Sequence, residues 1–101
     1  MSEKHNGWTN YETWCYALWM DNDEASYKYW REAAEGTIKH SLDADDAKYK
    51  LMETIREACE QMTPEVDGVF ADLLGAAISE INWHEIASHL VDEVYSDIEA
   101  A

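Results

Sequence analysis

The stretch TPEVDGVFADLLGAAISEINWHEIASHL (residues 63–90) holds the most apolar segment of the chain, with one helix-start signal before it and another after it. Thr63 followed by Pro64 is typical of an N-cap with proline at the first helical position. The apolar residues that follow recur every three or four positions and predict a helix that ends near Glu80. We expect this helix at the centre of the fold. Its predicted inward face is Val66, Val69, Phe70, Leu73, Leu74, Ala77, Ile78 and Ile81.

The final helix is predicted to begin after Asn82, which is a strong N-cap residue. Glu85, three residues later, completes a capping box, and Ile81 and Ile86 occupy the positions of a hydrophobic staple. The apolar stripe of this helix is Trp83, Ile86, Leu90, Val94 and Ile98.

Three further helices are predicted before this stretch. The first runs from about residue 10 to 20, with a capping box that starts at Thr9. The second runs over residues 24–35 and is ended by Gly36, and the third runs over residues 43–62. Their predicted apolar faces are Tyr11, Trp14, Cys15 and Leu18; Tyr27, Trp30, Ala33 and Ala34; and Leu51, Met52, Ile55, Ala58, Cys59 and Met62.

The composition favours a single helical domain. The chain has 101 residues, one Pro, four Gly and no stretch that alternates like a strand. We therefore predict an all-α fold, a compact bundle of about five short helices. Residues 1–101 form one domain in this interpretation, and residues 1–8 form a polar arm.

Acidic residues dominate the second half of the chain. The net charge is -15, and from Glu57 onward there is no Lys or Arg beside eleven carboxylates. Direct binding of nucleic acid needs a basic patch, so it is not expected, whereas basic protein surfaces are attracted. Carboxylates three and four apart form one strip on the third helix and another on the last. The candidate partner-binding residues are Glu53, Glu57, Glu60, Asp92, Glu93 and Asp97.

No membrane-spanning run and no signal peptide are found, and the two cysteines lie inside helical patterns. We therefore expect a cytoplasmic protein with reduced thiols and no contact with membranes. His84 and His89 are five apart, one residue too many for the zinc-protease helix motif. Glu-x-x-Glu pairs, which bind magnesium in some helical enzymes, also occur, but they are expected by chance in a chain with 22 acidic residues. We expect no metal, no cofactor and no enzymatic activity.

Aromatic residues crowd the first third of the chain. We assign Trp14 and Trp30 to the core. Three other rings fall outside the predicted apolar stripes, and they are Tyr16, Trp19 and Tyr29. Because aromatic residues are enriched at binding hot spots, these three form an alternative partner or homodimer surface.

The run WTNYETW (residues 8–14), followed by LW at 18–19, DNDE at 21–24 and YW at 29–30, resembles a group of small uncharacterised proteins from phages, plasmids and bacterial genomes. This resemblance implies a mobile-element setting and carries over no site residue. Small acidic proteins of such elements are similar in character to anti-restriction and anti-CRISPR inhibitors, several of which imitate DNA.

Charge and resemblance together lead to one expectation and one alternative. The expectation is a non-enzymatic inhibitor that occupies the basic nucleic-acid-binding surface of a host defence protein, such as a CRISPR effector or a restriction enzyme, in the bacterial cytoplasm. The alternative is a protein–protein interaction module or homodimer that works through its aromatic N-terminal third.

Overall fold

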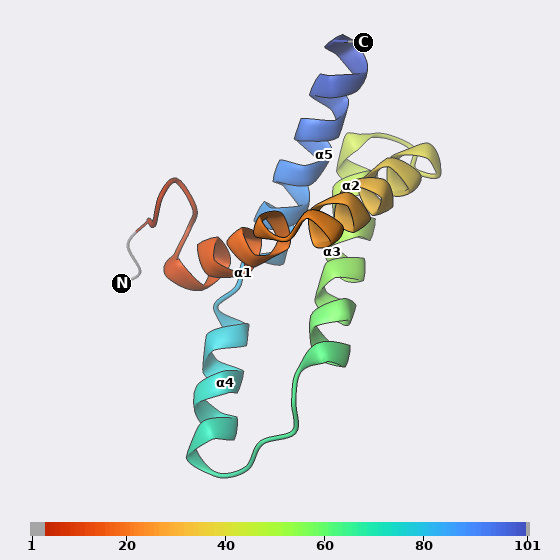
Figure 1. Ribbon diagram of the computed structural model, residues 1–101. Helices are drawn as coiled ribbons and strands as arrows, with labels where there is room; N and C mark the ends of the chain where they lie inside the picture. Colours follow the sequence, from red (N-terminus) through yellow and green to blue (C-terminus); the bar gives the residue numbers. More distant parts are fainter. Residues whose placement is uncertain (1–3, 101) are drawn as a thin grey trace.

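Five helices follow one another in the computed structural model, which describes residues 4–100 (Figure 1). They are α1 (Tyr11–Asn22), α2 (Glu24–Lys39), α3 (Ala44–Met62), α4 (Val69–Ser79) and α5 (Trp83–Ala100). No strand occurs between residues 4 and 100, where a single bridge pairs His5 with Trp8. The prediction of an all-α bundle of about five helices is confirmed. Residues 1–3 of the predicted polar arm lie outside the described residues.

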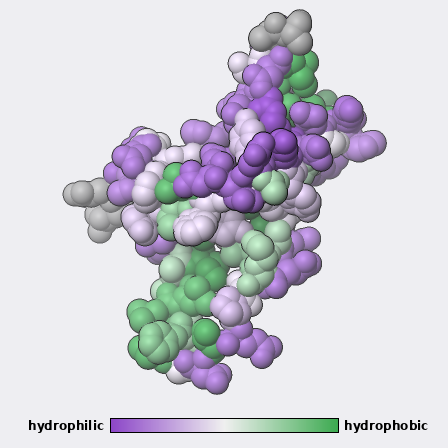
Figure 2. Space-filling view, viewed as in Figure 1, coloured by the Kyte–Doolittle hydropathy of each residue, from purple (hydrophilic) through white to green (hydrophobic). Residues whose placement is uncertain are grey.

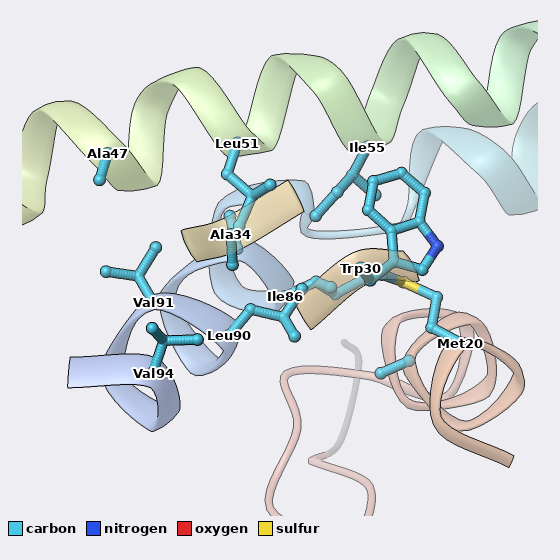
Figure 3. Packing of buried hydrophobic residues seen from close by; sticks show 12 residues of the cluster. Met20, Trp30, Ala34, Ala47, Leu51, Ile55, Ile86, Leu90, Val91 and Val94 are labelled. Carbon is cyan, nitrogen blue, oxygen red and sulfur yellow. The ribbon is translucent and has the colours of Figure 1, made fainter. Parts of the chain in front are cut away.

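The core lies where α2, α3 and α5 cross, and α1 closes one side of it (Figure 3). Leu51 and Ile55 of α3 are fully buried; Leu51 points towards Ala34 of α2, and Ile55 lies beside Trp30 (Figure 3). The α5 side chains that complete the core are Ile86, Ala87, Leu90, Val91 and Val94. The core position predicted for Trp30 is therefore confirmed.

The α4 helix stands outside this core, and its predicted central position is wrong. Val69, Phe70 and Leu73 are 63%, 68% and 61% exposed, and α4 has no buried residue. Figure 1 shows α4 and the end of α3 running as a hairpin away from the other helices, which contributes to the 49 Å long axis of the molecule. The apolar character of a helix predicts that one of its faces is buried, but it does not say whether the same chain or another molecule buries it.

The joint between α3 and α4 also differs from the prediction. Thr63 ends α3 instead of starting α4, because both its N–H and its Oγ1 donate hydrogen bonds to the carbonyl of Cys59, at 2.9 and 2.7 Å. Pro64 then begins a non-helical connection. The α4 helix starts only after Gly68, which has a φ of 66° that glycine adopts without strain.

Two further helix boundaries were predicted wrongly. Gly36 does not stop α2, which continues to Lys39 because Ile38 packs against the core. In α1 the N-cap is Asn10, not Thr9, and the buried face is Thr13, Ala17 and Met20. Of the predicted face of α1, Tyr11 and Leu18 are exposed, while Trp14 and Cys15 are half-buried.

The start of α5 agrees with its predicted N-cap. The Oδ1 atom of Asn82 accepts a hydrogen bond from the N–H of Glu85 at 3.0 Å. Ile86, Leu90 and Val94 are buried as the stripe predicts. Between residues 4 and 100, none of the helices combines the length and the apolar character that a bilayer crossing requires.

Candidate interaction surfaces

A polar clamp joins the start of α1 to the joint between α4 and α5. The side chain of Asn10 accepts from the N–H and Oγ1 of Thr13, at 2.9 and 2.6 Å, and its Nδ2 donates to the carbonyl of Glu80 at 2.7 Å. Thr13 Oγ1 in turn accepts from the N–H of Asn82 at 2.9 Å. Asn10 and Thr13 are both buried, so each polar atom is satisfied where water is scarce.

The clamp extends to Thr9 and explains why the predicted capping boxes are incomplete. The N–H of Thr9 donates to Glu85 Oε1 at 3.1 Å, so this carboxylate serves α1 instead of closing the box at Asn82. Thr9, Asn10 and Thr13 all belong to the WTNYETW run. The clamp holds the C-terminal end of α4 against α1, whereas Val69, Phe70 and Leu73 nearer its start stay exposed.

An apolar groove of about 410 Å³ lies between α1, the end of α3 and α4. Tyr16 and Trp19 line it from α1, Met62 from α3, and Leu74 and Ile78 from α4. Glu12 is the only charged side chain among its lining residues in the described part of the chain. The groove therefore presents apolar side chains to whatever enters it.

The outward side of α4 continues this apolar surface. Figure 2 shows apolar residues gathered over α4, at the lower end of the view. Val69, Phe70 and Leu73 are the exposed large side chains of the helix, and Met62 and Val66 are exposed before it. We call residues 62–79 the apolar arm.

The alternative surface predicted from the aromatic residues is assembled by the fold. Tyr16, Trp19 and Tyr29 line one hollow of about 660 Å³ between α1, α2 and α3. Trp19 is 74% exposed, and it lies at the boundary with the apolar groove, which it also lines. The three residues are thus brought together, and their hollow is continuous with the apolar arm through Trp19 and Met62.

Tyr16 differs from the other two rings because it is half-buried. It packs edge-on against Trp83 of α5, with ring centroids 5.0 Å apart. Burial raises the pKa of its hydroxyl well above the ordinary value, and the neighbouring Cys59 adds to the effect. Tyr16 therefore forms a fixed, uncharged wall of the groove, whereas Trp19 and Tyr29 are open to a partner.

The carboxylates predicted on α5 are held by cations of other helices. Arg31 of α2 forms ion pairs with Glu93, at 3.9 Å, and with Asp97. Lys48 of α3 holds Asp92 at 3.1 Å. These three candidate residues therefore join α5 to α2 and α3 within the chain.

The three candidate carboxylates on α3 divide in a different way. Glu53 pairs with Arg56 at 2.6 Å, whereas Glu57 and Glu60 are exposed and form no ion pair within residues 4–100. Glu57 lies about 14 Å further along α3 than the Lys48 that holds Asp92. The two predicted strips therefore do not merge, and the unpaired end of the α3 strip lies beside the apolar arm.

A smaller hollow of about 320 Å³ lies on α1 and α5 and contains Asp21, His89 and Glu93. The ring of His89 stacks on Trp8, with centroids 4.1 Å apart. Burial and the charge of Glu93 raise the pKa of Asp21, and His89 opposes this rise. Within residues 4–100 no three His, Cys, Asp or Glu residues are placed to hold a metal ion.

One family matches nearly the whole chain. It is a family of unknown function, DUF7249, and the match covers residues 1–99. The chain belongs to DUF7249. Searches of curated proteins and of solved structures returned no match. The polar clamp, the apolar groove and the apolar arm all lie inside the span of this DUF7249 match.

Sequence reasoning missed two parts of these surfaces. The clamp was missed because its partners lie about 70 residues apart, although Asn10 followed by Thr13 has the spacing of an N-cap oxygen and the N–H that donates to it. Apolar periodicity does not predict the exposure of α4, because the same pattern occurs in core helices and in helices that a partner covers. The absence of any Lys or Arg near α4 was a signal in the sequence for an unusual surface.

Proposed function

We propose that this chain is a non-enzymatic protein-interaction module that binds through the apolar groove and the apolar arm. One observation supports the proposal most strongly: the most apolar helix of the chain has no buried residue. Soluble monomers rarely expose large continuous apolar patches, and such patches mark interaction sites. The groove beside α4 is apolar as well. The apolar surface therefore has a concave part, the groove, and a convex part, the exposed face of α4.

The exposed aromatic residues support the same surface. Trp19 lines both the apolar groove and the hollow that contains Tyr16 and Tyr29, so one partner can contact both. Trp and Tyr are the residues that most often dominate binding energy, because they bury a large area with few rotatable bonds. Trp19 and Tyr29 are accordingly the aromatic anchors of this proposal, with Tyr16 as the wall beneath them.

A second candidate function is the acidic inhibitor that occupies a basic nucleic-acid-binding surface of a host CRISPR effector or restriction enzyme. It is favoured by the carboxylates of α3 and the apolar arm that form no ion pair within residues 4–100, which are Glu57, Glu60, Glu65, Asp67 and Asp72. Four of the six candidate residues already have cationic neighbours. The anionic surface of this proposal is therefore centred on the end of α3 and the arm.

The two functions are separated by capture from a bacterial host lysate with matched variants. The double variant Phe70→Ser plus Leu73→Ser removes the apolar surface, and Leu42→Ser is its control because Leu42 is 93% exposed and lies far along the chain from α4. An interaction module loses its captured protein with the double variant alone, and the complex survives high salt. Recovery of the same protein by both variants would refute this function.

A second pair of variants, which changes charge, tests the acidic-inhibitor function. Glu57→Lys plus Glu60→Lys is compared with Glu32→Lys plus Glu99→Lys, a control that makes the same change in net charge elsewhere. An acidic inhibitor captures a nucleic-acid-binding protein that high salt releases, and only the first double variant loses it. Equal capture by both charge variants would exclude a specific anionic surface at the end of α3.

A further inference from the structure

We propose that a second copy of this chain covers α4, in a two-fold symmetric dimer in which the exposed faces of the two α4 helices pack antiparallel with Leu73 near the axis. The inference rests on the proposed function, because it uses the same apolar surface and names its occupant. Three observations carry it: the width of the apolar arc on α4, the near-absence of charge on that helix, and the area that two copies bury.

The apolar arc of α4 is wider than its own chain covers. At about 100° per residue, the apolar side chains from Val69 to Ile78 span an arc of about 200° around the helix axis. Leu74 and Ile78 on one half of the arc face the groove and are half-buried. Val69, Phe70 and Leu73 on the other half are exposed. A second helix laid against that half completes the burial.

The charge of α4 favours a like copy as the partner. In a chain of net charge -15, Asp72 is the only charged residue from Val69 to Ser79. Two copies repel each other everywhere that carboxylates face carboxylates. The α4 helix is the segment where two copies can meet with the fewest charged side chains, one Asp72 from each copy. An isologous contact also places the same apolar patch on both sides, so one sequence feature supplies both halves.

The available area matches that of a small, weak interface. Full burial of one large apolar side chain removes about 60–120 Å² from water. With Met62, Val66, Val69, Phe70 and Leu73 more than a third exposed, each apolar arm offers about 300 Å². A symmetric dimer covers two arms of about 300 Å² each and two groove surfaces of about 100 Å² each, about 800 Å² in total, which is the size of a small, weak interface.

The response to salt distinguishes this dimer from a complex with a basic protein. Two chains of charge -15 repel each other, so screening of that repulsion strengthens the dimer. A complex with a basic partner weakens as salt rises. The sign of the salt effect therefore reports the occupant of the apolar surface.

Sedimentation equilibrium tests the proposal, with the chain at about 1 to about 500 µM, a range that brackets micromolar affinities. The expected mass rises from 11.6 kDa towards twice that value, and the dissociation constant falls as salt rises from about 0.05 to about 0.5 M. Leu73→Glu is expected to remain a monomer, because it places two carboxylates at the axis. Its control, Leu42→Glu, is expected to dimerise like the unmodified chain.

A cross-link supplies a second readout that does not depend on a disruptive substitution. A short bismaleimide is expected to join two copies of Leu73→Cys at low micromolar concentration, and to join neither Leu42→Cys nor the unmodified chain, whose Cys59 is buried and whose Cys15 is half-buried. Circular dichroism confirms that each variant keeps its helices.

Each outcome of these measurements decides the proposal. A monomer at every concentration, equal dimerisation of the two glutamate variants, or equal cross-linking of the two cysteine variants overturns the dimer. Such a result leaves the interaction module to the capture experiment, where another protein is the occupant. If Leu73→Glu is monomeric but captures the same proteins as the unmodified chain, the dimer stands and the proposed partner surface fails.

Discussion

Replacement of Arg31 by Met is expected to lower the free energy of unfolding by about 1.5 kcal/mol, because Arg31 is the main ionic link between α2 and α5. Its side chain is 22% exposed and reaches Glu93 and Asp97 across the helix interface, as well as Glu35 on its own helix. Met keeps most of the apolar length of the Arg side chain, so the change removes charge with little loss of packing.

The magnitude follows from the exposure of the partners. Exposed ion pairs contribute about 0.2–1 kcal/mol each, and the three carboxylates around Arg31 are about half exposed. Two cross-helix pairs and one pair within α2 therefore sum to about 1.5 kcal/mol. The variant also leaves Glu93 and Asp97 beside each other without a cation, which adds repulsion in the same direction. For a domain of this size the expected fall in Tm is about 6–12 °C.

Urea unfolding followed by circular dichroism measures the change, and Lys28→Met is the matched control. Lys28 pairs with Glu24 at 3.3 Å, but both side chains are mostly exposed, so its loss is expected to change stability by less than about 0.5 kcal/mol. High salt should reduce the difference between the Arg31 variant and the unmodified chain. Equal stability of the two variants at low salt would show that Arg31 is not a structural link.

Three further substitutions test the clamp, the core and the ionisation of a surface carboxyl. Asn10→Ala should destabilise the chain by about 2–3 kcal/mol in urea unfolding, because it removes the cap on the Thr13 N–H and leaves a carbonyl unpaired. Ile55→Ala should cost about 2–5 kcal/mol in the same assay, because Ile55 is fully buried, and a cost under about 1 kcal/mol would contradict the core assignment. Asp21→Asn should stabilise the chain at pH 7 by at most about 0.5 kcal/mol. Burial and Glu93 raise the folded-state pKa of Asp21 above 3.8, so its ionised form opposes folding, and thermal unfolding at several pH values should show the gain fading as pH falls through that pKa.

The sequence predicts buried residues best in helices that have one solvent-exposed face and one buried face. In α3 three of the four buried residues, Leu51, Ile55 and Cys59, are on the predicted stripe, and only Ala47 was missed. In α5 Asn82 caps the helix as expected. These features depend on local spacing and on side chains close in the chain, which pattern reasoning can read. The prediction of five helices in an all-α fold succeeds for this reason.

The prediction fails where distant segments decide the outcome. Thr13 is polar, so periodicity leaves it off the buried face of α1, but its hydroxyl bonds to Asn82 and it is fully buried. Arg31 reaches Asp97 only because α2 crosses α5, and nothing near either residue in the sequence indicates this pair. The candidate carboxylates could therefore be read from the sequence, but their division into paired and unpaired groups could not.

The polar clamp has a consequence for the order in which the chain is completed during synthesis. Thr9, Asn10 and Thr13 leave the ribosome early, while their partners at residues 80–85 follow about 70 residues later. At about 5–20 residues per second, the first helix waits about 4–14 s for the groups that hold it. Throughout that interval Ala17 and Met20 lack the α5 residues that cover them. The nascent chain therefore exposes these apolar side chains until residues 80–94 have been synthesised, and the interval lengthens wherever slow codons fall between the two halves of the clamp.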